Sequence, residues 1–403
     1  MKKEYEKEDG KCVFFLEGRI SAENSDLLKK ELTELMEAQP DSEILLDARK
    51  LEYISSAGLR VFLGLMKKCG KKISIRNVSV GIYDILAMTG FTEIMNVERQ
   101  MESISTKNCK FLGAGRSSNV YRLNAETIVK KYDPHVPIEK IRREMTLARK
   151  AFIYGISTAI PFDIVKADDA LGVVFELIAP ADTVGNTISA HMERFEELTK
   201  KYTALLKQLH HTKLEDKEKF PSIADTWMGW LEGMKPYYSE EEIRLMEEML
   251  RGVPQRDTLV HCDYHENNVL VQNDELFLID MADIGYGHPI FDLAGGAFRA
   301  HTCQIPGRGA RYGFSVENMQ VFWKTVLRYY FETEDSGTLH QIHEMCHAFG
   351  LLRSALFPMK HVQISEELRQ MHVNDARTNL FPRRDWALQQ VKNLAQFFPE
   401  NED

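Results

Sequence analysis

Two short apolar runs joined by a polar turn constrain the fold of this chain more than any other segment. The runs cover residues 269–271 and 276–280, and four polar residues separate them. This pattern predicts two paired strands with a turn between them. Asp263 and Asn268 lie five positions apart in the loop before the first run, and the second run ends at Asp280. We therefore expect the hairpin to bring Asp263, Asn268 and Asp280 around one point.

Phosphoryl transfer requires this combination of side chains. One carboxylate, here Asp263, orients the acceptor hydroxyl, while an Asn and a second Asp, here Asn268 and Asp280, hold the Mg²⁺ that neutralises the transferring phosphate. The alternative is a hairpin whose polar residues only cap turns, and for Asp263 by itself that alternative is favoured. The complete pattern, H-x-D-x-x-x-x-N followed by two apolar runs and an Asp, favours a phosphotransferase, provided that a nucleotide-binding lobe precedes it.

A glycine-rich turn at residues 111–121 predicts the start of such a lobe. Gly113 and Gly115 let the backbone approach phosphate groups that a Cβ atom would block. Ser118 lies in the same turn and is a further candidate for nucleotide binding, and an alternating apolar stretch follows it.

The next segments supply the remaining parts of a nucleotide site. Lys130 lies in a predicted strand at 127–132, where its ammonium would pair with the α- and β-phosphates. A predicted helix at 138–152 carries Glu144, which would hold Lys130 in place. The strand at 172–178 carries Glu176 and Ile178 into a hinge whose backbone groups would bind adenine. A Lys–Glu pair is usually a surface ion pair, and it is the order of these parts along the chain that favours a kinase.

Residues from about 108 to 395 resemble the aminoglycoside phosphotransferase and choline kinase family. His261, Asp263 and Asn268 match the family's H-x-D-x-x-x-x-N motif, and Asp280 matches its metal-binding Asp. The resemblance implies an α+β kinase-like fold with a small β-rich N-lobe (109–180) and a large helical C-lobe (181–403). It also implies ATP or GTP as the donor, Mg²⁺ as the cofactor and a hydroxyl group of a small molecule or a Ser as the acceptor.

The segment 285–294 resembles the family's G-x-G-x-P-x-x-D-L-A run. The resemblance implies that Asp292, together with His261, supports the catalytic loop. The chain departs from the family at two places: Cys262 replaces a common Gly, and Ala282 replaces a common acidic residue. Asp283 follows directly, and its role is left open.

The first hundred residues form a separate predicted domain. Strands are expected at 12–18, 43–47, 72–76 and 93–97, and helices at 21–38 and 81–88. The segment 53–60 is expected to turn into a further helix through Val61, Phe62, Leu65 and Met66. Alternating strands and helices imply an α/β domain, a mixed sheet covered by helices. Polar residues 101–108 are the predicted linker to the second part of the chain.

Residues from about 3 to 100 resemble the STAS domain of bacterial anti-sigma factor antagonists, on the segment from Asp47 to Tyr-Ile-Ser-Ser-Ala-Gly-Leu-Arg60. The resemblance implies that Ser56 is a phosphoacceptor and that the surface around it binds an anti-sigma factor. A helix N-terminus stabilises a phosphate, and the added charge would disrupt a docking surface. The alternative is that Ser55 and Ser56 only cap the helix.

Composition limits the remaining classes of function. A net charge of −9 argues against nonspecific binding to nucleic acid or to a membrane surface. Six scattered Cys without a C-x-x-C pair, and the lack of a signal peptide or a long apolar run, predict a cytoplasmic protein. The oligomeric state is not predicted.

One motif competes with the kinase interpretation. His343-Glu-Met-Cys-His347 matches the zinc-protease pattern H-E-x-x-H, with His361 or Glu366 as candidate third ligands. The segment also falls in the helical lobe that a kinase-like fold requires, so packing is favoured. Three hypotheses remain for the whole chain: an anti-sigma factor antagonist with an active kinase, a small-molecule kinase with a STAS sensor, and an inactive kinase-like scaffold.

Overall fold

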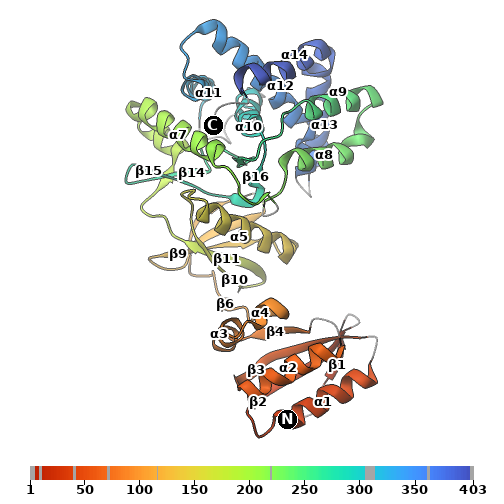
Figure 1. Cartoon of the computed structure of the whole chain (residues 1–403). Coiled ribbons are helices and arrows are strands. Elements are labelled where there is room, and N and C mark those ends of the chain that lie inside the picture. The colour runs from red at the N-terminus through yellow and green to blue at the C-terminus, as the bar shows by residue number, and fades with distance from the viewer. Residues whose placement is uncertain are drawn as a thin grey trace. The chain divides into compact units, whose positions relative to one another are not determined.

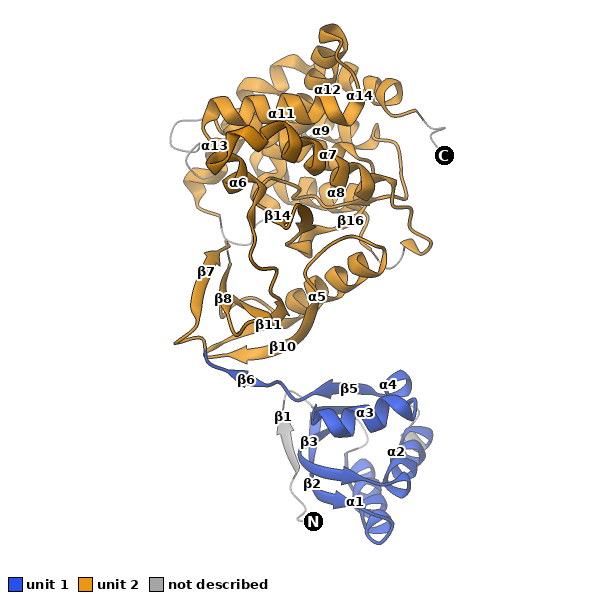
Figure 2. Ribbon diagram, turned by 90° about the vertical axis from the view of Figure 1, so that its left-hand side faces the viewer, with its two compact units in different colours: residues 1–105 blue, residues 106–403 orange. Residues whose placement is uncertain are grey.

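The computed structural model describes residues 5–8, 11–39, 42–69, 73–115, 117–217, 220–304, 314–360 and 364–399. The chain divides into two compact units, Met1–Ser105 and Thr106–Asp403, coloured separately in Figure 2. The division falls inside the predicted linker.

The first unit is built on a five-stranded mixed sheet. Its strands are β1 (Tyr5–Glu8), β2 (Lys11–Ile20), β3 (Glu43–Ile54), β4 (Ser74–Val78) and β5 (Asn96–Arg99), in that spatial order. β1 pairs antiparallel with β2, and the other neighbours are parallel. The helices are α1 (Ser25–Ala38), α2 (Ser56–Cys69), α3 (Val80–Met88) and the one-turn α4 (Phe91–Ile94), shown in Figure 1. The predicted fold class is confirmed.

Several boundaries in this unit differ from the prediction, and local contacts explain three of the differences. α1 begins at Ser25, because Asn24 accepts a hydrogen bond from the Ser21 amide at 2.9 Å and donates one to the Arg19 carbonyl at 2.8 Å, which holds the preceding residues in a turn. β3 continues to Ile54, whose partner on β2 is Ile20. The last strand begins at Asn96 because α4 occupies the preceding residues.

The second unit begins with an antiparallel sheet, after a two-residue strand, β6 (Ser103–Ile104), that precedes the division. Its strands lie in the order β10 (Pro161–Ala167), β11 (Ala170–Glu176), β9 (Thr127–Tyr132), β8 (Ser118–Arg122) and β7 (Lys110–Ala114). The long helix α5 (Ile138–Ile153) contacts β10 and β11. This is the β-rich lobe of a kinase-like fold.

The rest of the unit is mainly helical. The helices are α6 (Val184–Ala190), α7 (Phe195–His211), α8 (Ile223–Met234), α9 (Glu240–Arg251), α10 (Ile290–Thr302), α11 (Val316–Phe331), α12 (Ser336–Lys360), α13 (Glu366–Asn379) and α14 (Arg384–Phe397). Short strands pair as β12 (Asp182–Thr183) with β14 (Val269–Gln272), β14 with β15 (Glu275–Leu278), and β13 (Leu259–Val260) with β16 (Gly285–Tyr286).

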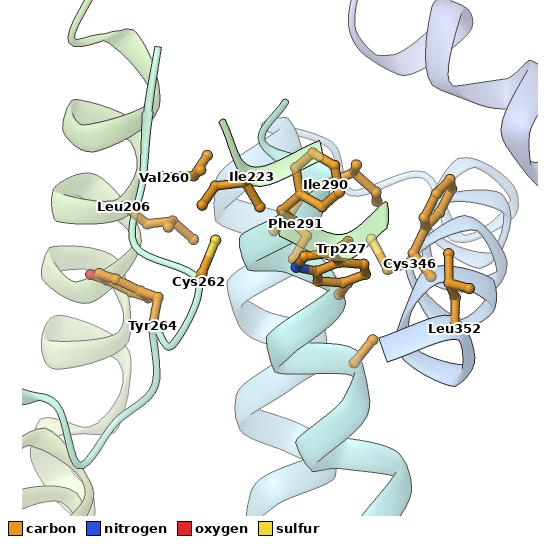
Figure 3. Close-up of a cluster of buried hydrophobic side chains, with 14 of the residues drawn as sticks. Leu206, Ile223, Trp227, Val260, Cys262, Tyr264, Ile290, Phe291, Cys346 and Leu352 are labelled. Carbon is orange, nitrogen blue, oxygen red and sulfur yellow. The ribbon is translucent and has the colours of Figure 1, made fainter. Parts of the chain in front are cut away.

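The helical lobe has its core around α10 and α12. Gly350 of α12 allows a close approach, because a Cβ atom there would lie 2.9 Å from the Phe298 amide nitrogen of α10. Trp227 of α8 packs edge-on against Phe291 of α10, with ring centroids 4.9 Å apart. Figure 3 shows that Cys262 belongs to the same buried cluster. The loop before β14 is therefore anchored in the core. None of the described helices is long and apolar enough to cross a membrane.

Candidate active site

The β14–β15 hairpin places Asn268 next to Asp280. Its turn residues, Asn273 and Asp274, both have positive φ angles, 48° and 67°, as a tight two-residue turn requires. Val269 pairs with Leu278, so the preceding Asn268 faces Ile279, whose amide donates a 2.9 Å hydrogen bond to the Asn268 carbonyl. Asp280 is the next residue. The hairpin register therefore sets the backbone of Asn268 opposite the residue before Asp280.

Asp263 lies between two residues that anchor its loop. Cys262 and Tyr264, both labelled in Figure 3, are each 3% exposed. The Tyr264 hydroxyl donates a 2.7 Å hydrogen bond to the Tyr202 carbonyl of α7. Cys262 has a φ of 62°, in the left-handed region that favours glycine. This turn reverses the chain so that Asp263 is 30% exposed while its neighbours stay buried. The Asn268 side-chain amide donates a 3.0 Å hydrogen bond to the Asp263 carbonyl and joins the two ends of the loop.

Asp292 holds the loop from beneath. Its Oδ1 accepts the Cys262 amide at 2.6 Å, and its Oδ2 accepts the His261 amide at 2.8 Å. His210, at the end of α7, lies 3.1 Å from the same Oδ2. Burial acts to raise the pKa of Asp292, but the hydrogen bonds and charge from His210 outweigh burial and hold the pKa below its usual range. No sequence motif marks His210, and its contact with Asp292 depends on the packing of α7.

The imidazole of His261 contacts both the loop before β14 and the residues after β15. Its Nδ1 lies 3.2 Å from the Asp263 amide, and its Nε2 lies 3.1 Å from the Ile279 carbonyl. The ring is fully buried. His261 therefore ties the backbone of Asp263 to the residue before Asp280.

Lys130 forms an ion-pair chain between β9, α5 and the hairpin. Its Nζ lies 2.6 Å from Glu144 Oε1 and 3.0 Å from Asp280 Oδ1. Burial alone would lower the pKa of Lys130, but Asp280 and Glu144 outweigh burial and raise the pKa well above its ordinary value. Lys130 in turn is the main cause of a lowered pKa at Asp280. Both groups are therefore ionised near neutral pH.

Two cations of α12 contact the Asp263 carboxylate, and no motif in the sequence marks either of them. Arg353 NH2 lies 3.2 Å and Lys360 Nζ 3.0 Å from Asp263 Oδ1. Burial acts to raise the pKa of Asp263, but Lys360 and Arg353 hold it well below its usual range. The only sequence signal was Arg353 itself, because a charged residue inside the apolar run 348–358 needs a buried partner.

The glycine-rich segment and the hinge occupy separate positions in the sheet. Gly113 lies in β7 opposite Val120, and the Gly115 amide donates a 2.7 Å hydrogen bond to the Ser118 carbonyl. Ser118 begins β8 and is 6% exposed. Glu176 ends β11, and its amide bonds to the Ile160 carbonyl at 2.9 Å. Ile178 lies two residues beyond, and within the described residues its backbone has no hydrogen-bond partner.

The donor set fits a magnesium ion. The Asn268 amide nitrogen is engaged with Asp263, which turns the side-chain oxygen to the opposite side. Asp280 is ionised, 42% exposed on its side chain and held in a left-handed backbone conformation, with φ 63°. Magnesium prefers few protein oxygens completed by phosphate oxygens and water. Asn268 and Asp280 would supply such a pair.

Ser56 occupies a simpler environment in the first unit. It is the first residue of α2 and is exposed. The preceding Ser55 accepts a 3.4 Å hydrogen bond from the Gly58 amide, which is the cap contact. No hydrogen bond of the Ser56 hydroxyl occurs within the described residues. The capping contact found here therefore belongs to Ser55.

The H-E-x-x-H segment lies within α12. The centroids of the His343 and His347 rings are 6.0 Å apart, while Glu344 accepts hydrogen bonds from Trp386 at 2.9 Å and Arg383 at 3.3 Å. Among the described residues no group of three or more His, Cys, Asp or Glu side chains is arranged to hold a metal ion. Glu366 starts α13, and His361 lies outside the described residues.

Comparison with known proteins identifies both parts of the chain. The model of the phosphotransferase enzyme family matches residues 108–321, and the model of the STAS domain matches residues 2–104. The "Putative anti-sigma factor antagonist BtrV" of Bordetella bronchiseptica is 28% identical over 106 residues, which cover 26% of this chain and 90% of that protein. The "Anti-sigma F factor antagonist" of Paenibacillus polymyxa is 26% identical over 97 residues, covering 23% and 83%.

Among solved structures, a choline/ethanolamine kinase family protein from Mesorhizobium loti has a TM-score of 0.48 and 16% identity, covering 71% of this chain and 93% of that chain. The phosphotransferase family model covers more than half of the sequence. The chain therefore belongs to the phosphotransferase enzyme family and carries a STAS domain at its N-terminus.

Proposed function

We propose that the second unit is a Mg²⁺-dependent kinase that transfers the γ-phosphate of ATP, or of GTP, to a hydroxyl group. The observation that carries this proposal is the approach of Lys130, Asp280 and Asn268 to one end of the hairpin whose loop holds Asp263. A β-rich lobe at 109–180 would bind the nucleotide, and the helical lobe at 181–403 would bind the acceptor.

Each side chain has one proposed task. Lys130, held by Glu144, binds the α- and β-phosphates, and the segment with Gly113, Gly115 and Ser118 covers them. Glu176 and Ile178 mark the hinge that receives the base. Mg²⁺, held by Asn268 and Asp280, would neutralise charge on the phosphates.

Asp263 acts on the acceptor. Its carboxylate orients the hydroxyl and takes its proton late in the transfer. Asp292 and His261 keep the loop in place and do not touch the reacting atoms. The low pKa of Asp263 favours the charged form that this task requires.

For the first unit we propose an anti-sigma factor antagonist that is switched at Ser56. Two proteins named as anti-sigma factor antagonists resemble this unit over most of their own length. Ser56 is exposed at a helix N-terminus, where a phosphate would be stabilised and would add roughly two negative charges. A phosphate there would oppose the docking of an anti-sigma factor, and its source would be another kinase or this chain's own kinase unit.

In each of two alternative hypotheses, one of the two units has a smaller role. In one, the kinase acts on a small aminoglycoside- or choline-type molecule and the STAS domain is only a sensor or interaction module. In the other, the kinase-like unit is an inactive scaffold. The buried, mutually compensating charges around Asp263 speak against a scaffold, because buried charges without a task are readily replaced by apolar residues.

ATP turnover tests the kinase proposal. We expect Asp263→Asn to lower the rate of ADP release from Mg·ATP by roughly 10²- to 10⁴-fold. Asp169→Asn, at a side chain that is 75% exposed, is the matched control and should keep the wild-type rate. If the wild-type protein turns over neither ATP nor GTP, with water or with a panel of amino alcohols as acceptor, the kinase proposal is wrong and the inactive scaffold is the remaining hypothesis.

Intact mass after incubation with Mg·ATP tests the Ser56 acceptor. A gain of one phosphate in the wild type that disappears in Ser56→Ala identifies this chain as its own kinase. An equal gain in both proteins would contradict that acceptor.

A further inference from the structure

Lys360 is the last residue of α12 and joins two carboxylates of the site. Its Nζ lies 3.0 Å from Asp263 Oδ1 and 2.8 Å from Asp283 Oδ2, and its side chain is 9% exposed. Asp283 ends the short 3₁₀ turn after Asp280. The residues matched by the phosphotransferase family model end at 321, well before Lys360.

We infer that Lys360 is a positioning residue for the proposed phosphoryl transfer and that Asp283 is its anchor rather than a metal ligand. This inference rests on the proposed kinase function. It gives a role to Asp283, which the sequence motif alone could not assign.

The contacts of Asp263 divide its two oxygens between two tasks. Oδ1 receives both Lys360 and Arg353, whereas Oδ2 has the imidazole of His265 at 3.8 Å. The carboxylate of Asp turns easily about its last bond. Two cations on Oδ1 stop this rotation and leave Oδ2 directed to an acceptor hydroxyl.

Arg353 and Lys360 lie on the same helix and both contact Asp263, but their other contacts differ. They are seven residues apart, two turns of α12, and so lie on one face. Arg353 also donates a 2.8 Å hydrogen bond to the Cys262 carbonyl and thus fixes the backbone of the loop. The ion pairs of Lys360 are both with side-chain carboxylates, so it sets the carboxylate rather than the loop.

Burial of Lys360 distinguishes this contact from a surface ion pair. A buried ammonium is costly unless opposite charges surround it. Asp263 and Asp283 supply two, one on each side. Removing either carboxylate therefore releases the ammonium from its position between them, and Asp283 becomes necessary for the position of Lys360.

Four variants and one control test the inference through ADP release from Mg·ATP with water as the acceptor. We expect Lys360→Met to lower kcat by roughly 10- to 100-fold while KM for ATP changes by less than about threefold. Lys360→Arg, which keeps the charge, should recover part of the loss. Asp283→Asn should lower kcat in the same way but less, and adding it to Lys360→Met should cause little further loss. Lys235→Met, at an exposed lysine of the same lobe, is the matched control.

The Mg²⁺ dependence separates the two roles of Asp283. As an anchor, it can be replaced by Asn without changing the Mg²⁺ concentration that gives half the maximal rate. A shift of that concentration in Asp283→Asn but not in Lys360→Met would assign Asp283 to the metal and overturn the inference. If Lys360→Met does not fold, the kcat values of Asp283→Asn and Lys360→Arg test the inference instead. Wild-type kcat in both of these variants would also overturn the inference.

The kinase proposal and this inference fail differently. No nucleotide turnover in the wild type removes the proposed function itself. Turnover in the wild type with an equal or higher kcat in folded Lys360→Met removes only the positioning role, and a higher kcat would mean that Lys360 blocks the site.

Discussion

Ser56 and Asp263 are the two side chains to which we assign chemistry, and their surroundings differ in origin. Ser56 is exposed, and the contacts that hold its turn come from residues 20 to 58 of the first unit. Asp263 is held by Asp292, Arg353 and Lys360 of the second unit, which lie far along the chain. The first site needs only the pairing of β2 with β3 and the start of α2, whereas the second exists only when several helices have packed.

Because the two sites are held by different kinds of contact, we expect substitutions in them to change stability by different amounts. An exposed helix start interacts mainly with water, so a substitution there changes few contacts. A buried network of charges and hydrogen bonds loses several partners at once when one member changes. Substitutions in the two units can therefore test whether this contrast is real.

The largest effect on stability is expected at Asp292. In Asp292→Asn one oxygen becomes an NH₂ group, which cannot accept the buried His261 or Cys262 amide, and the second unit should lose about 3 kcal/mol of unfolding free energy. Calorimetry that resolves the two units would measure it.

Asp47→Asn is the matched control in the first unit. Asp47 is also buried, and its Oδ1 accepts the Arg49 amide at 3.0 Å, which the oxygen of Asn can continue to accept. The side chains of Arg76 and Asn77 bind Oδ2 and can turn to new partners. We expect a smaller loss there, about 1 kcal/mol. Equal losses at both positions would remove the contrast between the units.

Gly58→Ala tests the one tight place beside the Ser56 turn. A Cβ atom at Gly58 would lie 2.5 Å from Ile20 Cγ2 and 2.9 Å from Ile54 Cγ1. Overpacking should destabilise the first unit by about 1–3 kcal/mol. Gly64→Ala on the same helix meets nothing within 4 Å and should be neutral or stabilising. The thermal unfolding of the two variants would be compared, and a stable Gly58→Ala protein would contradict this packing.

Acid should destabilise the second unit selectively. All 13 His lie after residue 105, and burial lowers the pKa of His288 from 6.5 to about 3. Below pH 6.5 His288 binds a proton in the unfolded chain but stays neutral in the folded protein. The contribution of His288 to the unfolding free energy is therefore complete above pH 6.5 and falls by on the order of 1 kcal/mol per pH unit as the pH drops toward 3.

Replacing His288 by Asn should flatten that dependence. Asn offers an oxygen near the position of Nδ1, which accepts the Ile290 amide at 3.1 Å. His135→Asn, at an exposed histidine, is the control. Unfolding free energies measured at several pH values would decide, and an unchanged slope in His288→Asn would assign the acid sensitivity to other groups.

The smallest effects are expected at the Ser pair. Ser56→Ala should change the unfolding free energy of the first unit by less than about 0.5 kcal/mol. Ser55→Ala removes the cap and should cost about 0.5–1 kcal/mol. The reverse order, with Ser56 as the costlier position in thermal unfolding, would return Ser56 to a structural role.

The sequence predicted those features that depend on neighbours along the chain. The hairpin and the spacing of Asp263, Asn268 and Asp280 follow from apolar runs and a turn, so the local pattern was sufficient. The predicted strand at 127–132 coincides with β9. Boundaries shifted where side chains compete with the helix, as Asn24 does before α1.

Three partners of the catalytic loop were not found in the sequence. No motif in the sequence surrounds His210, Arg353 or Lys360. Each of these residues belongs to a helix whose apolar pattern predicts a buried face. The pattern does not predict which other elements pack against that face. Their contacts arise when α7, α10 and α12 pack, and no periodicity in the sequence encodes which polar groups then meet.

The sequence by itself determined the two domains, their fold classes and the residues that match a phosphotransferase loop, because periodicity, turns and motif spacing are local. Only the tertiary structure decided how Asp263 is held. Its carboxylate is buried enough to need compensating charge, and the cations that supply this charge come from α12, whose position depends on the packing of the whole helical lobe.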